Sequence, residues 1–279
     1  MAKWMQERNV RGAWRLESLL ANPRWEQALV RTELGPGVSF DFPLEYGRTH
    51  YNLMNLKAYE HALIRYVSAV LAHYSEPFTL LDCGADIGLL SARLVAESWN
   101  LRRVIAFEPN SQAFGFLKNN LALLPCTARA HSAAVANFDG RGRLRLPDFD
   151  PSKHACFIEP DPSGAIEVLR IDALQLEPEI NLLFKIDVEG GELDVLRGAE
   201  HTLRAAREVV VVFEAHPRQS ARVGIDPVEI IQYLRSLIGR PLEVTVVEAP
   251  DLTVNLDRPL WSQSVPSGVL NICVYSRPA

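Results

Sequence analysis

Residues 78–109 read FTLLDCGADIGLLSARLVAESWNLRRVIAFEP, and this stretch decides the fold. A short apolar run ends in turn residues, a segment with helical periodicity follows, and a second apolar run ends in Glu108 and Pro109. Short apolar runs on both sides of a helix predict two buried, parallel strands joined by a crossover helix. The stretch therefore predicts a βαβ unit of an α/β protein.

The alternation of strands and helices continues to the end of the chain. Helical periodicity recurs in SQAFGFLKNNLALL, GELDVLRGAEHTLRAA and DPVEIIQYLRSLI. With the opening stretch included, seven apolar runs are expected to be strands, at residues 78–84, 102–109, 127–135, 181–190, 207–217, 242–248 and 268–276. We therefore expect a doubly wound, mostly parallel seven-stranded sheet with helices on both faces.

Residues 1–75 precede this alternation and predict a helical N-terminal arm or lid. Within the arm, residues 34–52 are rich in turn formers and aromatics, which indicates a loop or short strands. Residues 58–74 are its clearest helix, because their apolar side chains recur at helical spacing. A group of polar and aromatic residues in the arm belongs either to a lid that excludes water or to an ordinary exposed loop. These residues are Tyr46, Arg48, His50 and Tyr51.

Residues 76–279 are the expected main domain, and residues 137–170 form an insertion within it. The insertion contains alternating arginines and then a loop rich in proline and aspartate. Arg141, Arg143 and Arg145 belong either to the solvated face of a strand, which we favour, or to a site for an anionic substrate.

The composition excludes several kinds of protein. With 29 lysines and arginines against 34 aspartates and glutamates, the chain lacks the basic excess that nucleic-acid binding requires. No apolar run approaches the roughly 18 residues of a membrane span, and the first residues do not resemble a secretion signal. The four cysteines form no C-x-x-C pair and no zinc pattern. We expect a cytoplasmic protein with buried, reduced thiols, a small-molecule partner and no resident metal; the oligomeric state stays open.

The loop Asp82-Cys-Gly-Ala-Asp-Ile-Gly88 lies where doubly wound folds bind their ligands. A dinucleotide-binding loop has a middle glycine that lets the backbone approach a pyrophosphate, and this chain has Asp86 there. Because a carboxylate repels phosphate, the loop favours a phosphate-free nucleoside. S-adenosylmethionine is the obvious candidate, since its sulfonium and ammonium groups are positive.

Glu108 supports the same cofactor. It ends the second strand, 20 residues after Gly88, where an acidic side chain can accept both ribose hydroxyls. The alternative is a plain turn followed by a surface glutamate. Ser132 and Ala133 either border the adenine or simply end the third strand. The expected cofactor contacts are Asp82, Gly84, Ala85, Asp86, Gly88, Glu108, Pro109, Ser132 and Ala133.

The motifs DCGADIG, AFEPN, LRIDAL, KIDVEGGELDVLRGA and FEAHP, in this order, resemble those of FkbM-type methyltransferases. The resemblance covers about residues 58–216 and is most specific in KIDVEGGE. It implies a class I, Rossmann-like fold that uses S-adenosylmethionine, releases S-adenosylhomocysteine and methylates a hydroxyl of a sugar or secondary metabolite. Asp86 departs from the asparagine usual in the family, which leaves the hydrogen bonding of the loop open.

The candidate catalytic residues are polar side chains that follow the fourth and fifth expected strands. They are Asp187, Glu189, Glu214 and His216. If these strands are neighbours, the four residues overlook one crevice, where a base can take the proton of an acceptor hydroxyl. Structural alternatives are a helix cap for Asp187, a first-turn residue for Glu189 and a strand end for His216. Lys185, within an apolar strand, is expected to pair with a carboxylate.

The sequence as a whole favours an S-adenosylmethionine-dependent O-methyltransferase. The alternatives are an N-methyltransferase, a nicotinamide-dependent oxidoreductase and a non-catalytic protein of the same fold. The missing middle glycine disfavours the oxidoreductase, and the carboxylates at the strand ends disfavour a loss of activity. No NPPY-like motif follows NLLFKI, which disfavours N-methylation.

Overall fold

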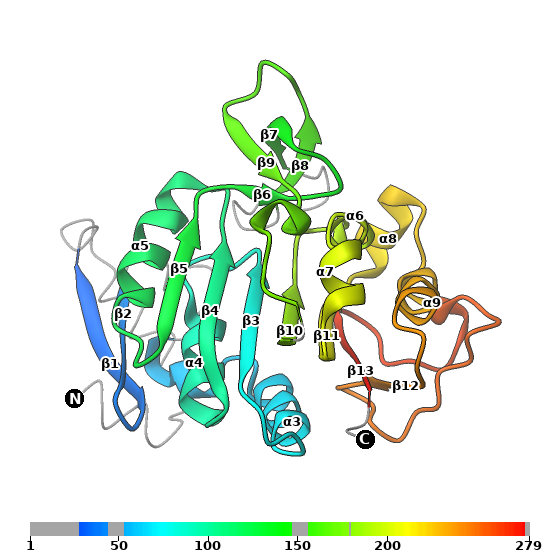
Figure 1. The fold of residues 1–279 in the computed structure, drawn as a ribbon, viewed down its shortest axis with the longest axis horizontal. Coiled ribbons are helices and arrows are strands. Elements are labelled where there is room, and N and C mark those ends of the chain that lie inside the picture. Colours follow the sequence, from blue (N-terminus) through cyan, green and yellow to red (C-terminus); the bar gives the residue numbers. More distant parts are fainter. Residues whose placement is uncertain (1–27, 44–52, 147–155, 179, 277–279) are drawn as a thin grey trace.

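A computed structural model describes residues 28–43, 53–146, 156–178 and 180–276. Its centre is a seven-stranded sheet with the strand order β12-β13-β11-β10-β3-β4-β5 (Figure 1). The strands are β3 (Phe78–Cys83), β4 (Leu101–Phe107), β5 (Thr127–His131), β10 (Asn181–Ile186), β11 (Glu208–Ala215), β12 (Leu242–Val246) and β13 (Leu270–Ser276). All pairs from β11 to β5 are parallel, and β13 is antiparallel to its two neighbours. The predicted doubly wound, mostly parallel, Rossmann-like sheet is confirmed.

Helices cover both faces of the sheet, because its central strands are apolar on both sides. They are α3 (His61–Leu71), α4 (Leu89–Glu97), α5 (Ser111–Leu121), α6 (Glu192–Arg197), α7 (Glu200–Ala205), α8 (Pro217–Val223) and α9 (Pro227–Leu237). Helices α3, α4 and α5 share one core with Leu80 and Leu183. Helices α6, α7 and α9 share the other core with the next residues along the strands, Leu81 and Phe184.

The order of the strands places the site. From β3 the chain runs outward to β4 and β5, and then crosses to β10 on the other side of β3. The loops that follow β3 and β10 therefore leave the sheet in opposite directions and open a crevice at its carboxyl edge. Backbone hydrogen bonds tie this edge together, from Asp187 N to Cys83 O at 3.0 Å and from Gly84 N to Phe107 O at 3.1 Å.

The N-terminal arm is not wholly helical: a strand hairpin lies where a helix was predicted up to residue 33 and a loop or short strands from residue 34. Strands β1 (Leu29–Gly35) and β2 (Val38–Pro43) form an antiparallel hairpin beside α4 and α5. The physical reason is strand periodicity: Val38, Phe40 and Phe42 are buried on one face while the residues between them are half-buried. The predicted helix of residues 58–74 is present as α3. The division into an arm and a main domain stays a prediction.

The helix predicted after β10 is broken into α6 and α7. The break lies at Gly198, where an added Cβ atom would lie 2.0 Å from the carbonyl oxygen of Ala136. Because the two backbones approach so closely, a side chain does not fit there. The glycine thus lets the second helix pack under the small sheet that follows β5.

The insertion forms that small sheet, with the strand order β6-β9-β7-β8, above the carboxyl edge of the main sheet (Figure 1). Its strands are β6 (Ala134–Val135), β7 (Gly140–Arg145), β8 (Phe157–Pro160) and β9 (Ile166–Leu169). Arg143 and Arg145 are exposed and form ion pairs, each 2.8 Å long, with Asp161 and Glu159. These pairs support the solvated-face interpretation of the arginines.

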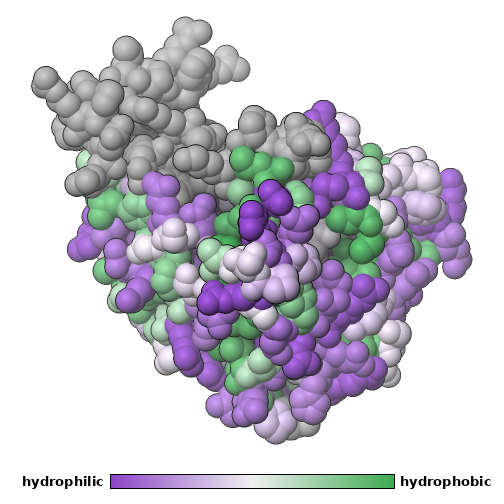
Figure 2. All heavy atoms as spheres, turned by 90° about the horizontal axis from the view of Figure 1, so that it is seen from above, coloured by the Kyte–Doolittle hydropathy of each residue, from purple (hydrophilic) through white to green (hydrophobic). Residues whose placement is uncertain are grey.

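The surface seen from above is mixed. In Figure 2, hydrophilic residues are spread over the visible face with smaller hydrophobic areas between them, in the part that grey atoms do not cover. Among the helices of the described residues, none has the length and apolar character needed to cross a membrane. In the described part of the chain the four cysteines form no disulfide bond. Cys83 and Cys273 are buried as expected, whereas Cys126, which was also expected to be buried, is half-buried, as is Cys156.

Candidate active site

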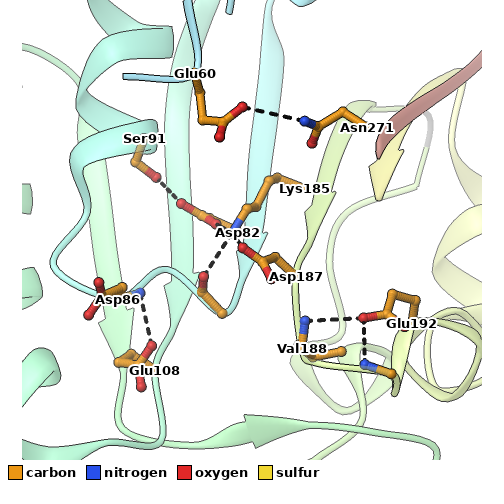
Figure 3. Close-up of polar contacts among 12 residues, drawn as sticks. Glu60, Asp82, Asp86, Ser91, Glu108, Lys185, Asp187, Val188, Glu192 and Asn271 are labelled. Atoms are coloured by element: carbon orange, nitrogen blue, oxygen red, sulfur yellow. Dashed lines mark hydrogen bonds and ion pairs between the residues drawn. The ribbon is translucent and has the colours of Figure 1, made fainter. Parts of the chain in front are cut away.

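Glu108 organises the loop after β3, and its carboxylate is where the 20-residue spacing places it. The backbone N–H of Asp86 donates to Oε2 at 2.8 Å (Figure 3). The backbone N–H of Asn110 donates to Oε1 at 2.7 Å. Burial raises the pKa of Glu108 to about 7, although both backbone hydrogen bonds oppose this rise. Since an ionised carboxylate has about four lone-pair sites, each oxygen keeps capacity for one further donor.

Two glycines give the loop its shape. Gly84 has φ +83°, and a Cβ atom added to it would lie 1.9 Å from the carbonyl oxygen of Asp187. Gly88 also has φ +83° and begins α4. Asp86 adopts φ +47°, which non-glycine residues rarely do, and this conformation turns its N–H toward Glu108. The loop is therefore a strained turn drawn against the end of β10.

Lys185 of β10 lies under this turn and joins the two strand ends. Its Nζ donates to the carbonyl oxygen of Gly84 at 2.8 Å and to Asp187 Oδ2 at 3.1 Å, and it lies 3.7 Å from Asp82 Oδ1 (Figure 3). Asp82 is fully buried and accepts from Ser91 at 2.6 Å. Burial opposes the charge on Lys185, but Asp187 and Asp82 outweigh it and raise the lysine pKa. The predicted pairing of Lys185 with a carboxylate is confirmed.

A cavity of about 290 Å³, counting its open mouth, lies beside Lys185 between the start of α3 and the ends of β10, β11 and β13. Its polar lining comes from four separate parts of the chain. These residues are Tyr59, Glu60, Lys185, Asp187, Glu214 and Asn271. Glu60 Oε2 accepts from Asn271 Nδ2 at 3.4 Å across the cavity wall (Figure 3). Asp187 thus borders both the Gly84 turn and this cavity.

Glu214 is a strongly perturbed carboxyl group of the site. Its pKa is raised to about 9, first by the negative charge of Asp187, then by burial and by Glu189, while Lys185 opposes the shift. Buried carboxyl groups that lie close together cannot all ionise at neutral pH. Glu214 is therefore protonated in the free protein near pH 7, and it is a hydrogen-bond donor as well as an acceptor.

This perturbation predicts a pH dependence of stability. The unfolded chain releases the Glu214 proton near its ordinary pKa of 4.5, whereas the folded protein holds it up to about 9. The folded state binds more protons across this interval, so Glu214 makes stability fall as the pH rises. In thermal unfolding from about pH 6 to about pH 9, the Glu214→Gln variant should lose less Tm than the wild-type protein. Parallel Tm curves for the two proteins would contradict the assignment.

A second cavity lies on the other side of Glu214, against α6, α8 and α9. It is lined by Glu189, Glu192, Glu214, His216 and Gln219 together with apolar side chains. Gln219 Nε2 donates to Glu189 Oε2 at 2.6 Å. Glu192 Oε1 accepts from the backbone N–H of Gly190 at 2.9 Å and so ties down the loop after β10.

The structure divides the four candidate catalytic residues between these two cavities. Strands β10 and β11 are parallel neighbours, as the prediction required. Asp187 and Glu214 line the first cavity, and Glu189, Glu214 and His216 line the second. Asp187 is not the cap of the next helix, because the N-cap of α6 is Gly191.

His216 has the structural role that the sequence left open. It is the N-cap of α8, and its Nδ1 accepts from the backbone N–H of Arg218 at 3.0 Å. A neutral histidine that accepts through Nδ1 carries its proton on Nε2. While this cap is kept, His216 offers a donor to the cavity and no second basic nitrogen.

Sequence reasoning missed part of the site. Tyr59, Glu60 and Asn271 line the first cavity, but each comes from a segment without a recognisable motif. Arg93 of α4 is buried and donates to the carbonyl oxygens of Leu56 at 3.1 Å and Tyr59 at 3.3 Å. It thereby holds the turn that brings Tyr59 and Glu60 to the cavity. A buried arginine in an apolar helix face is the one signal that pointed to this turn.

The remaining predicted residues are placed as follows. Pro109 is half-buried, Ser132 is exposed and Ala133 is buried, beyond the ends of β4 and β5. The lid residues proposed above, Tyr46, Arg48, His50 and Tyr51, lie outside the described residues. Within the described part of the chain, no three His, Cys, Asp or Glu side chains are grouped so as to hold a metal ion.

Comparison with known proteins identifies relatives of this site. Residues 82–238 match the family described as the methyltransferase FkbM domain. The hexuronic acid methyltransferase AglP of Haloferax volcanii is 26% identical over 174 residues, which are 60% of this chain and 66% of that protein.

Two solved structures resemble the chain at low identity. The FkbM methyltransferase of Methylobacillus flagellatus has 19% identity and a TM-score of 0.44, over 72% of this chain and 44% of its own. The precorrin-6y C5,15-methyltransferase of Geobacter metallireducens has 15% identity and a TM-score of 0.40, over 77% of this chain and 87% of its own.

Proposed function

Because the chain belongs to the FkbM methyltransferase family, we propose that it transfers a methyl group from S-adenosylmethionine to a hydroxyl oxygen of a small molecule or sugar. One observation carries this proposal. The Gly84–Gly88 turn, Glu108 and Asp187 meet at the carboxyl edge of β3, β4 and β10, on the switch point of a doubly wound sheet.

The residues at this edge fit a phosphate-free adenosine cofactor. Glu108 keeps one acceptor site on each oxygen, as the two ribose hydroxyls require. Asp82 is buried beneath the turn beside Ser91 and Lys185. The carboxylate of Asp86, within the turn, is proposed to complement the positive ammonium and sulfonium groups. Pro109, Ser132 and Ala133 are proposed to border the adenine beyond β4 and β5.

In the proposed reaction, Asp187 is the general base. S-adenosylmethionine supplies the methyl group, which its positively charged sulfur makes electrophilic. Asp187 accepts the proton of the acceptor hydroxyl while the oxygen forms its bond to the methyl carbon and the carbon–sulfur bond breaks to leave S-adenosylhomocysteine, and the proton then passes to solvent. A positioned base of this kind contributes about 10² to 10⁴ in rate. Lys185 holds the Asp187 carboxylate in place through its 3.1 Å contact.

The other candidate catalytic residues orient the acceptor in this proposal. Glu214 stands between the two cavities and, being protonated near pH 7, donates to an acceptor oxygen. His216 contributes its Nε2 proton, because its Nδ1 caps α8. Glu189 is held by Gln219 and acts as an acceptor for hydroxyl groups.

The acceptor is proposed to be a sugar. The support is the name of the relative from Haloferax volcanii, which states a hexuronic acid as that protein's substrate. It is strengthened by the mixed donor and acceptor groups of the first cavity, which suit hydroxyl groups.

A methyl-transfer assay tests the proposed function. The protein is incubated with methyl-labelled S-adenosylmethionine and a panel of sugars, and products are followed by mass spectrometry and by release of S-adenosylhomocysteine. We expect label on an oxygen of the sugar. Label found solely on amine nitrogens of matched amino compounds would contradict the hydroxyl assignment.

A further inference from the structure

We infer that the acceptor group entering the cavity beside Lys185 is an uncharged polyhydroxyl group, and that Glu60 excludes acceptors carrying a carboxylate there. This inference rests on the proposed function, because it names the substrate class of the same site, and it separates the acceptor of this chain from the hexuronic acid in the name of the Haloferax volcanii relative. It is carried by the charges that line the cavity and by the way its one lysine is bonded.

The cavity holds an excess of acidic groups. Glu60, Asp187 and Glu214 line it, whereas Lys185 is the one cationic residue among the described residues of the lining. The lysine is already engaged: its Nζ contacts the Gly84 carbonyl at 2.8 Å, Asp187 at 3.1 Å and Asp82 at 3.7 Å. A carboxylate on the acceptor would therefore enter without a free cation to neutralise it.

The raised pKa values of the carboxyl groups in the cavity indicate a negative electrostatic potential there. The pKa of Glu214 rises to about 9 mainly because Asp187 is near, and the pKa of Glu60 is also raised, by burial and then by Asp187 and Glu248. Neighbouring negative charge that raises the pKa of these glutamates opposes any further negative charge for the same reason. An uncharged hydroxyl group meets no such penalty.

The hydrogen-bonding groups suit hydroxyls. Asn271 Nδ2 donates to Glu60 Oε2 at 3.4 Å and to Glu248 Oε1 at 3.0 Å, so Glu60 and the amide form one wall of the cavity and Glu248 holds the amide from outside it. Tyr59 stands next to Glu60 on the turn that Arg93 holds. Acidic side chains, an amide and an aromatic ring together can accept from and donate to several sugar hydroxyls.

The test uses pairs of methyl glycosides that differ at one carbon. Methyl glucoside is compared with methyl glucuronide, and methyl galactoside with methyl galacturonide, by calorimetric binding to the protein saturated with S-adenosylhomocysteine. Like charges in close contact repel at the effective dielectric of a protein surface, so we expect at least about tenfold weaker binding of the uronides. Labelled methyl transfer should show the same order.

Variants at Glu60 locate the cause. Glu60→Gln should reduce the discrimination between the two members of a pair, and Glu60→Lys should reduce it further or invert it. Glu76→Gln is the matched control, because Glu76 is exposed just before β3, at the opposite edge of the sheet. Glu60→Gln keeps the size of the side chain, so it still reports if the lysine variant folds poorly.

The outcomes separate this inference from the proposed function. Four results would overturn the inference. They are equal or tighter binding of the uronides, a preference for the corresponding amino sugars, failure of all glycosides to bind, and unchanged discrimination in both Glu60 variants. Failure of the folded protein to bind S-adenosylhomocysteine would overturn the proposed function instead.

Discussion

Replacing Asp187 by asparagine should lower kcat by about 100- to 10,000-fold, because the amide cannot take the proton of the acceptor hydroxyl. Affinity for S-adenosylhomocysteine should change little, since Asp187 is the base in this account and Glu108 holds the ribose. The variant should fold, because Lys185 keeps Asp82 and the Gly84 carbonyl as partners. Single-turnover methyl transfer and calorimetry measure the two effects separately.

The control for this variant is Asp251→Asn, which makes the same substitution at an exposed position after β12. It should leave both kcat and cofactor affinity at wild-type values. If Asp187→Asn kept full kcat while the protein remained folded, another residue would have to be the base, or the reaction would need none.

Replacing Glu108 by glutamine should weaken binding of S-adenosylhomocysteine by about 100-fold. The carboxylate accepts from the backbone of Asp86 and Asn110 and is proposed to accept from both ribose hydroxyls as well. Hydrogen bonds to a charged acceptor contribute about 1.5–3 kcal/mol each, and about 2.7 kcal/mol corresponds to 100-fold in affinity. The amide nitrogen of glutamine would also face a backbone N–H that now has an acceptor.

Calorimetry on Glu108→Gln, with Glu76→Gln as its matched control, checks this expectation. Thermal unfolding of both variants shows whether the loop still folds without the carboxylate. A folded Glu108→Gln protein with wild-type affinity would remove Glu108 from the ribose assignment and leave its role to the loop alone.

The parts of the site that the sequence predicted are those with a local pattern. The turn from Asp82 to Gly88 and the strand that ends at Glu108 lie within 32 consecutive residues, so their relation depends on one βαβ unit. Lys185 was predictable for a similar reason, because a lysine in an apolar strand requires a nearby carboxylate. Such features follow from local sequence and from the chemistry of burial.

The parts that the sequence did not predict depend on distant segments. Glu60 and Asn271 are 211 residues apart and meet because β13 is antiparallel to β11 and α3 packs on the same side of the sheet. No local pattern fixes that register. His216 shows that residue type alone does not determine a role. A histidine can act as a base, but whether the Nδ1 of His216 caps α8 depends on side-chain geometry.

The segment that forms the hairpin of the arm has two sequence patterns, one typical of a strand and one typical of a loop. The alternation of Val38, Phe40 and Phe42 is a strand pattern, but it follows Gly35, Pro36 and Gly37, which also suit a loop. The packing of these apolar residues against α4 and α5 decides between the two. Tertiary contacts therefore determined a structure that local propensity left open.

The central claim is that the carboxyl edge of β3, β4 and β10 binds a positively charged, phosphate-free adenosine compound. Isothermal titration of the wild-type protein with S-adenosylmethionine, and with NADH in parallel, tests it most directly. The account predicts saturable binding of S-adenosylmethionine and none of NADH, whose pyrophosphate would face Asp86. A folded protein that binds NADH at this edge, or shows no saturable heat with S-adenosylmethionine, would contradict it.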